Sequence, residues 1–231
     1  MTGERSVGGW WVEHHRGSAA ALHAKPWPDP LVATVWMLEV DRPALVLGSV
    51  QGPESVDGTR LEALGIDLVR RRSGGGAVLL EPGRSVWIDV FLPRHDPRWD
   101  DDVHRSFVWL GEAWAVALGE LGLAAEVHRG GLERTAWSDR VCFAGLGSGE
   151  VTIGGVKAVG LSQRRTRRGA RFQCVIYRSW DASPLGALAG LDPALLPPVA
   201  TVDRPEAAIV AAVLRALRTA GGTVVAPDGS G

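Results

Sequence analysis

Cysteine, methionine and tyrosine are scarce in this chain of 231 residues, with two, two and one copies respectively. The two thiols, Cys142 and Cys174, are too few for a disulfide framework, so we expect a reducing, cytoplasmic compartment. No stretch reaches about 18 uninterrupted apolar residues, and the first seven residues lack the apolar core of a signal peptide, so no membrane partner is expected. The net charge of −1 gives no overall basic signal for nucleic acid.

What the chain does contain suits one globular domain with a real core. Hydrophobic residues make up 45% and charged residues 22% of the sequence, which is ordinary for such a domain. We expect an N-terminal segment over residues 1–30, a main domain over residues 31–220 and a flexible C-terminus over residues 221–231.

Strand and helix patterns alternate along the main domain. Apolar periodicity and turn residues predict helices over residues 59–64, 104–121 and 206–220. The same patterns predict strands over residues 8–13, 34–40, 44–47, 66–69, 85–92, 125–128, 151–153, 157–159 and 172–177.

The stretch around which the chain is organised is rich in arginine and glycine. Arg70, Arg71 and Arg72 run through Ser73 into three glycines, 74–76, and then into an apolar run. Consecutive glycines let a ligand lie against the backbone, and a neighbouring arginine can hold a carboxylate or phosphate. A glycine-rich hairpin with solvated arginines explains the composition equally well. The ending of a phosphate-binding P-loop is missing.

Two further residues are candidates for chemistry. Lys157 stands beside Gly154 and Gly155 in an apolar strand; a surface lysine is the commoner explanation, but in a pocket it could hold a carbonyl or phosphate, or move a proton. Cys142 lies in a glycine-rich loop that could expose it, and a nearby ammonium would favour its thiolate. Cys174 sits in an apolar strand and is expected to be buried and inert.

Other polar clusters are less specific. The three histidines near the N-terminus have no neighbouring residues at metal-ligand spacing, so we expect a loose surface segment and no metal site. A basic run after residue 163 could be a solvated loop, a nucleic-acid patch or a docking site for an acidic partner. It has no interleaved aromatic residues for base stacking, which weakens the nucleic-acid interpretation. The run comprises Arg164, Arg165, Arg167 and Arg168.

Three ordered motifs resemble the signature of the biotin/lipoate protein ligase superfamily, and in particular its lipoate-protein ligase and cysteine-dependent octanoyltransferase branch. Gly48-Ser49-Val50-Gln51 resembles a strand followed by Gly-x-x-Gln. Residues 71–78 are similar to Arg-Arg-x-x-Gly-Gly-x-Ala-Val, and residues 155–163 to Gly-x-Lys-x-x-Gly-x-x-Gln. One departure is Leu80, which replaces a histidine usual in the family.

The resemblance implies an α+β fold, with a mixed, largely antiparallel sheet and packed helices, like the catalytic domains of class II aminoacyl-tRNA synthetases and biotin synthetase. It implies transfer of an octanoyl or lipoyl group to a lysine of a lipoyl domain, in 2-oxoacid dehydrogenase or glycine-cleavage proteins. Lys157 would hold the acyl carbonyl. Residues lining the acyl or acyl-adenylate group would be Arg71, Arg72, Ser73, Gly74, Gly75, Gly76, Ala77, Gly155, Gly160, Ser162 and Gln163.

Two chemistries occur in the family. Ligases use ATP and Mg to form an acyl-adenylate, whereas cysteine-dependent octanoyltransferases take the acyl group from acyl carrier protein as an enzyme thioester, without a permanently bound cofactor. Val141-Cys142-Phe143 stands fifteen residues before Lys157, as in one transferase branch. Residues 147–150 also differ from the Arg-Asn-Asp of ligases. The leading hypothesis is therefore transfer through Cys142; an ATP-dependent ligase and a non-catalytic acyl-binding protein are the alternatives.

Overall fold

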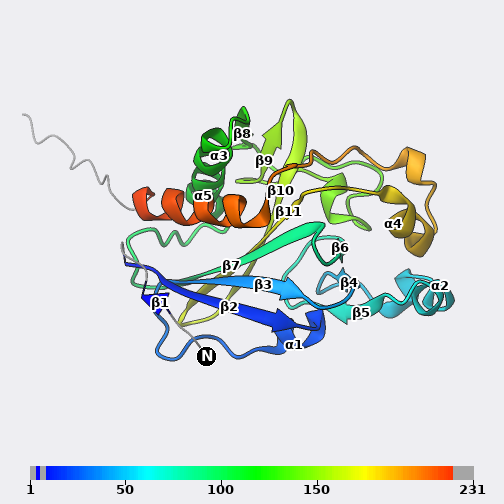
Figure 1. Cartoon of the computed structure of the whole chain (residues 1–231), viewed down its shortest axis with the longest axis horizontal. Coiled ribbons are helices and arrows are strands. Elements are labelled where there is room, and N and C mark those ends of the chain that lie inside the picture. Colours follow the sequence, from blue (N-terminus) through cyan, green and yellow to red (C-terminus); the bar gives the residue numbers. More distant parts are fainter. Residues whose placement is uncertain (1–3, 6–8, 221–231) are drawn as a thin grey trace, which may run out of the picture.

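The computed structural model describes residues 4–5 and 9–220, so the predicted flexible C-terminus, residues 221–231, lies outside the described residues. Its main sheet has eight strands in the order β1-β2-β3-β7-β11-β10-β9-β8 (Figure 1). Strands β2 and β3 are parallel, and the other neighbours are antiparallel. The strands are β1 (Glu4–Arg5), β2 (Trp11–Gly17), β3 (Thr34–Val40), β7 (Ser85–Pro93), β8 (Ala125–Val127), β9 (Val151–Ile153), β10 (Val156–Arg165) and β11 (Gly169–Tyr177).

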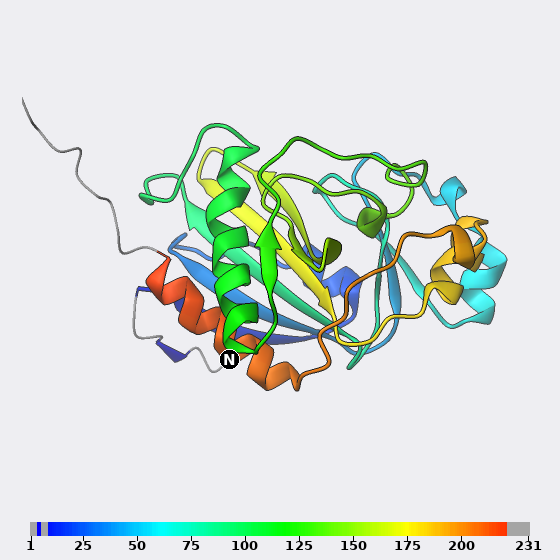
Figure 2. The same ribbon diagram turned by 90° about the horizontal axis from the view of Figure 1, so that it is seen from above.

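Two helices, α3 (Val108–Glu120) and α5 (Glu206–Thr219), cover one face of this sheet (Figure 2). Side chains alternate between the two faces of a strand. Even-numbered residues of β7 and β11, such as Ile88 and Cys174, therefore share an apolar core with Trp114 of α3. Burying each large aliphatic side chain of this core contributes about 1.5–3 kcal/mol, which holds the helices against the sheet.

Odd-numbered residues of the same two strands face the opposite side, where a second sheet packs. This sheet has the order β5-β4-β6, with β4 parallel to β5 and antiparallel to β6. Its strands are β4 (Ala44–Leu47), β5 (Asp67–Arg70) and β6 (Val78–Leu80). A core of side chains from both sheets and from the short helix α1 (Ala19–Ala24) lies between the layers.

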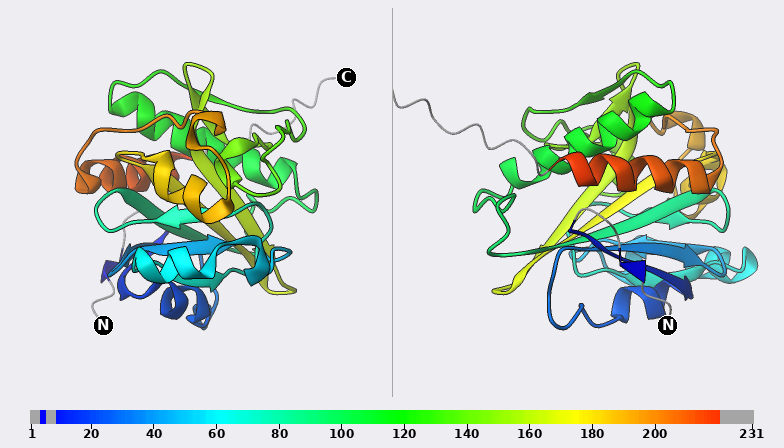
Figure 3. Two further views of the ribbon diagram at one scale, coloured as in Figure 1. Left: turned by 90° about the vertical axis from the view of Figure 1, so that its right-hand side faces the viewer. Right: turned by 60° about the vertical axis from the view of Figure 1, so that its left-hand side comes forward.

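Helices α2 (Gly58–Ala63) and α4 (Ala182–Ala189) pack on the far side of the small sheet (Figure 3). Each begins at an aspartate whose side chain accepts a backbone hydrogen bond, Asp57 from Arg60 and Asp181 from Ser183. Such caps satisfy amide groups that the first helical turn leaves unpaired. Short 3-10 turns complete the connections at Pro53–Ser55, Arg105–Phe107, Cys142–Ala144 and Pro193–Leu195.

The predicted fold class, an α+β domain with a largely antiparallel sheet, is confirmed. Helices α1 and α4 are absent from the sequence-based prediction, because α1 has only six residues and the sequence of α4 contains Pro184 and Gly186. The strand expected over residues 8–13 is β2, which runs over residues 11–17. No helix in residues 4–5 and 9–220 is both long and apolar enough to cross a membrane.

Candidate active site

Arg71 holds the glycine-rich segment in place from inside. Its guanidinium is buried and donates hydrogen bonds to the carbonyl oxygens of Val46 (3.1 Å), Gly74 (2.7 Å) and Gly76 (2.9 Å). These three bonds tie the segment to strand β4. Arg71 therefore shapes the loop, whereas its neighbour Arg72 is exposed on the surface.

The glycines are needed because backbone segments approach too closely for a side chain. A Cβ at Gly48 would stand 1.8 Å from the carbonyl oxygen of Gly75, and a Cβ at Gly76 would stand 2.6 Å from the backbone of Val141. Gly75 also has φ +95°, a conformation that residues with side chains rarely adopt. The first and second motifs are thus packed backbone to backbone.

The loop that carries Cys142 is attached to the same segment. The amide of Ala77 donates to the carbonyl of Arg140 (2.8 Å), and the amide of Cys142 donates to the carbonyl of Ala77 (3.0 Å). Gln51, the last residue of the first motif, accepts from the amide of Gly48 (2.9 Å) and donates to the carbonyl of Arg140 (3.0 Å). Gln51 therefore links the first motif to the cysteine loop.

Lys157 lies directly behind the cysteine turn. Its Nζ donates to the carbonyl oxygens of Cys142 (2.9 Å) and Gly145 (2.8 Å) and lies 2.6 Å from Oε2 of Glu150. A bulge between Lys157 and Val159 shifts the alternation of β10, so that Lys157 and Gly160 point to the same side of the sheet. This shift explains the three-residue spacing between the lysine and the glycine in the third motif.

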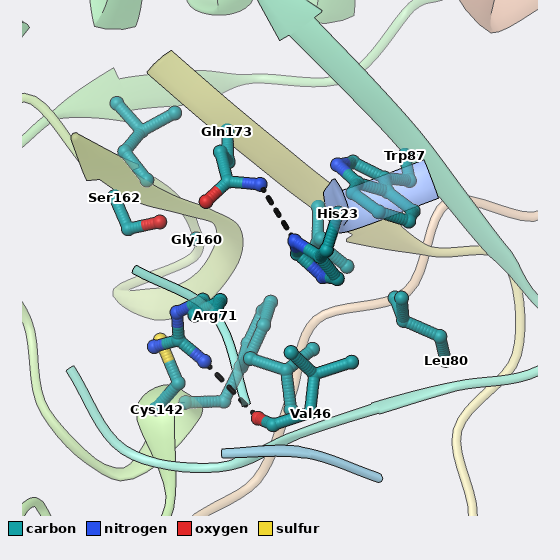
Figure 4. A pocket seen from close by; sticks show the side chains of 13 residues that line it. His23, Val46, Arg71, Leu80, Trp87, Cys142, Gly160, Ser162 and Gln173 are labelled. Carbon is teal, nitrogen blue, oxygen red and sulfur yellow. Dashed lines mark hydrogen bonds between the residues drawn. The ribbon is translucent and has the colours of Figure 1, made fainter. Parts of the chain in front are cut away.

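An apolar pocket extends from Cys142 into the space between the two sheets (Figure 4). Trp87 of β7 and Leu80 of β6 line it together with Val46 and Phe143. Leu80 is the residue at which the resemblance implied a histidine. The surface of the pocket is mainly apolar, which suits an apolar group attached at Cys142.

His23 is one of the polar residues that line this mainly apolar pocket (Figure 4). Its Nδ1 lies 3.3 Å from the amide nitrogen of Gln173, whose amide oxygen accepts a hydrogen bond from Ser73 (2.7 Å). Gln173 therefore donates to Nδ1, which places the proton of the neutral imidazole on Nε2. Nε2 is buried without a partner among the described residues. Burial, with Arg171 and Arg71 nearby, lowers the pKa of His23 to about 3, so the ring is neutral.

A wider groove reaches Cys142 from outside. Glycines 74–76, Lys157, Ser162 and Gln163 line it with Cys142, which thus borders both spaces. Three exposed aliphatic side chains stand along the groove, Val50 (89% exposed), Val103 (47%) and Leu132 (53%). Exposed apolar side chains gathered at one cavity are typical of a surface that receives a partner.

The structure brings together most of the residues expected at the site and separates a few. Arg71, Ser73, Cys142, Gly160 and Ser162 line the inner pocket or contact residues that do. Ala77 is buried behind the cysteine loop. Gly155 lies in the turn between β9 and β10, with φ +78°, and lines neither space.

The arginines of the basic run fall into two groups, those that contact other groups of the chain and those that pair with no carboxylate of the described residues. Arg165 donates to the backbone carbonyls of Asp100 (2.6 Å) and Asp101 (3.0 Å), and Arg168 pairs with Asp29 (2.9 Å). These two side chains serve the fold. Arg164 and Arg167 have no carboxylate within ion-pair distance in the part of the chain that the structure describes.

Sequence reasoning missed His23, Glu150 and Gln173. The N-terminal histidines were expected on a loose surface segment; instead His14 and His15 lie in strand β2, and His23 faces the pocket from α1. Gln173 carried a usable signal in the sequence, because it alternates with Arg171 in an otherwise apolar strand and the two therefore share one strand face. Cys174 points the other way into the helix-covered core, and burial raises the pKa of its thiol. Cys174 is therefore buried, as expected, and no reagent reaches its thiol in the folded protein.

The Cys142 thiol thus lies between an apolar pocket and an open groove, and Lys157 lines the groove. Residues 22–194 match the lipoyl protein ligase A/B catalytic domain, and the chain belongs to that family.

Two relatives and one solved structure show the extent of the likeness. The octanoyltransferase LipM of Carboxydothermus hydrogenoformans is 32% identical over 125 residues, which are 54% of this chain and 45% of the relative. That of Moorella thermoacetica is 34% identical over 158 residues, 67% and 52%. The chain thus spans about half the length of these curated relatives. A bipartite lipoate protein ligase from Thermoplasma acidophilum, solved in a study that includes its E2 lipoyl domain, has a TM-score of 0.65 at 18% identity over 90% of this chain and 84% of that one. This likeness confirms the fold.

The close approach at Gly76 leads to a stability prediction. We expect Gly76→Ala to lower the free energy of unfolding by about 1–3 kcal/mol, because the added methyl group meets the backbone of residues 141–142. Gly74→Ala is the matched control, since a Cβ there meets nothing within 4 Å and its φ is not positive. Urea unfolding measures both. Equal effects of the two substitutions would contradict the packing argument.

The buried imidazole leads to a pH prediction. The folded pKa of His23, about 3, lies below the unfolded value of 6.5, so the unfolded state binds more protons between these values. Stability should therefore fall as pH drops below 6.5, by about 2 kcal/mol from His23 alone between pH 6.5 and 5. In urea unfolding at both pH values, His23→Gln should lose this part of the dependence. The exposed-histidine control, His14→Gln, should retain it; an unchanged dependence in His23→Gln would refute the assignment.

Proposed function

We propose that this protein transfers an octanoyl group to a lysine of a lipoyl domain through a thioester on Cys142. The observation that carries the proposal is the position of Cys142, which borders both the apolar pocket and the open groove. The identity to two octanoyltransferases supports the choice of acyl group and reaction. The chemistry needs a reduced thiol, which agrees with the cytoplasmic compartment expected from the sequence.

The first half-reaction is acylation of the enzyme. The Cys142 thiolate attacks the carbonyl carbon of an octanoyl thioester, such as octanoyl-acyl carrier protein, that enters by the groove. A new carbon–sulfur bond forms, the donor thiolate leaves with the proton that Cys142 gave up, and the acyl chain occupies the apolar pocket. The amides of Gly74, Gly75 and Gly76 donate to no group of the described chain, and Gly75 lies near the Cys142 sulfur, so these amides are the proposed donors to the oxyanion of the intermediate.

The second half-reaction is aminolysis. The neutral amine of the acceptor lysine attacks the thioester from the groove and the amide bond forms. The carbon–sulfur bond breaks, and the departing Cys142 thiolate takes up the proton that the amine loses. A lipoyl domain is the proposed acceptor, in keeping with the archaeal system that pairs a lipoate protein ligase with an E2 lipoyl domain. The route requires no bound cofactor. A ligase route would instead consume ATP and form an acyl-adenylate without using the thiol.

Intact mass spectrometry separates these routes. After incubation with octanoyl-acyl carrier protein, we expect the wild type and Cys174→Ala to gain one octanoyl group that neutral hydroxylamine removes, as thioesters require. Cys142→Ala should gain none, because it lacks the nucleophile. If Cys142→Ala still modified a lipoyl domain as fast as the wild type, with release of pyrophosphate from lipoate and ATP, the ligase route would replace this proposal.

We further propose that the unpaired arginines beside the site receive the acidic carrier. Arg72 and Arg164 lie close enough that their like charges interact: burial, Arg72 and Arg171 together lower the pKa of Arg164. No carboxylate of the described chain pairs with Arg72, Arg164 or Arg167. An acidic partner would supply the missing negative charge. Of the four arginines expected to dock a partner, Arg164 and Arg167 thus remain available.

Steady-state kinetics with two donors tests this surface. In Arg72→Gln/Arg164→Gln, the KM for the octanoyl carrier should rise roughly 3- to 10-fold at low salt, because two exposed charge contacts are lost. The KM for a small octanoyl thioester should stay the same. Arg215→Gln, on helix α5 and paired with Glu120, is the control and should leave both values unchanged. An equal rise for the two donors would show that these arginines do not act on the carrier.

A further inference from the structure

Glu150 is a buried carboxylate that meets three segments of the chain at the site. It is 5% exposed and immediately precedes β9. Its Oε2 accepts from the amide of Gly147 (2.7 Å) and lies 2.6 Å from Nζ of Lys157, while Oε1 accepts from the amide of Leu161 (2.9 Å). Both carboxylate oxygens are therefore used, and they join the loop after the cysteine turn to strand β10.

The contacts of Lys157 show what this carboxylate does. A lysine ammonium has three N–H donors. Here they face the carbonyls of Cys142 and Gly145 and the carboxylate of Glu150. All three donors are occupied, so the expected hydrogen bond from Lys157 to an acyl carbonyl requires one of these contacts to open. In the structure as it stands, Lys157 clamps the two ends of the turn that carries the thiol.

The clamp depends on the charge of Glu150. An ammonium that is only 7% exposed is strongly unfavourable without a counter-ion, and removing one partner of a buried ion pair leaves the other uncompensated. No other carboxylate of the described residues lies within ion-pair distance of Lys157. Without Glu150 the ammonium would move toward water, and the carbonyls of residues 142 and 145 would lose their shared donor.

We infer that Glu150 is a positioning residue for acyl transfer: it keeps the Lys157 ammonium on the cysteine turn, and the turn in turn holds the Cys142 thiol beside glycines 74–76. The catalytic part of this inference rests on the proposed function. Glu150 acts through Lys157 on the backbone of the turn, so its effect belongs to the first half-reaction, before any acceptor is present. Because Glu150 also borders the groove, the rival role is direct contact with the acceptor lysine.

Single-turnover acylation distinguishes the two roles. Glu150→Gln should slow thioester formation at saturating donor on the order of 10- to 100-fold, since small displacements of a reacting group are costly. The donor concentration at half-saturation should change less than about threefold, because the pocket is untouched. Glu133→Gln, an exposed acid of the neighbouring loop, is the control. If Glu150→Gln acylates at the wild-type rate and loses only transfer to the lipoyl domain, the positioning role is wrong and acceptor contact replaces it.

Alkylation of Cys142 by iodoacetamide separates this inference from the proposed function, because it needs no substrate. Glu150→Gln should change the alkylation rate of Cys142 by about tenfold or more, since the turn is no longer held. Cys174 is fully buried and should stay unmodified in each variant, which shows that the variant is folded during the reaction. If Glu150→Gln fails to fold, Glu150→Asp keeps the charge and should show a smaller change in the same direction. Wild-type alkylation and acylation rates in whichever variant folds would overturn the inference.

Discussion

The Lys157 ammonium is the contact on which the geometry of the site depends. It joins the cysteine turn, the loop that follows it and the carboxylate of Glu150 at a single buried point. Burying a charge is expensive, and the attraction to Glu150 offsets that cost only because the remaining donors and acceptors are also satisfied. The carbonyls of residues 142 and 145 accept the remaining hydrogen bonds of the ammonium. Two backbone amides donate hydrogen bonds to the carboxylate. The result is a polar unit whose parts cannot move independently.

The glycine-rich segment fits this unit because it has no side chains to exclude the neighbouring backbone. The side chain of Arg71 donates hydrogen bonds to two carbonyls of this segment, and Gly76 packs against the backbone of the cysteine loop. The amides of Gly74, Gly75 and Gly76 donate to no group of the described chain, and Gly75 lies near the Cys142 sulfur. An arginine next to glycines is often taken as an anion-binding group. Here its carbonyl partners show that it builds the loop, while the neighbouring Arg72 stays exposed.

The three motifs and their order could be predicted from sequence, because each requires a particular residue at a fixed spacing. Gln51, Gly76 and Lys157 do meet at the cysteine loop. His23 could not be predicted, because its contact with Gln173 spans 150 residues and its helix is too short to give a periodic pattern. In the sequence, Glu150 stands out only as part of a departure from the ligase pattern. Its partners become apparent only when the hairpin of β9 and β10 folds back.

The pocket contains an imidazole, that of His23, although Leu80 stands where the resemblance to the family implies a histidine. Leu80 on β6 and His23 on α1 line the same cavity, reaching it from different layers of the fold. The neutral ring presents an N–H that no described residue accepts, and an unpaired buried donor costs about 1–3 kcal/mol. A purely apolar acyl chain would leave the Nε2–H of His23 unpaired, whereas an acyl chain with a hydrogen-bond acceptor at that depth would pair with it. The acyl group that this pocket favours therefore depends on how Nε2 of His23 is satisfied when the pocket is filled.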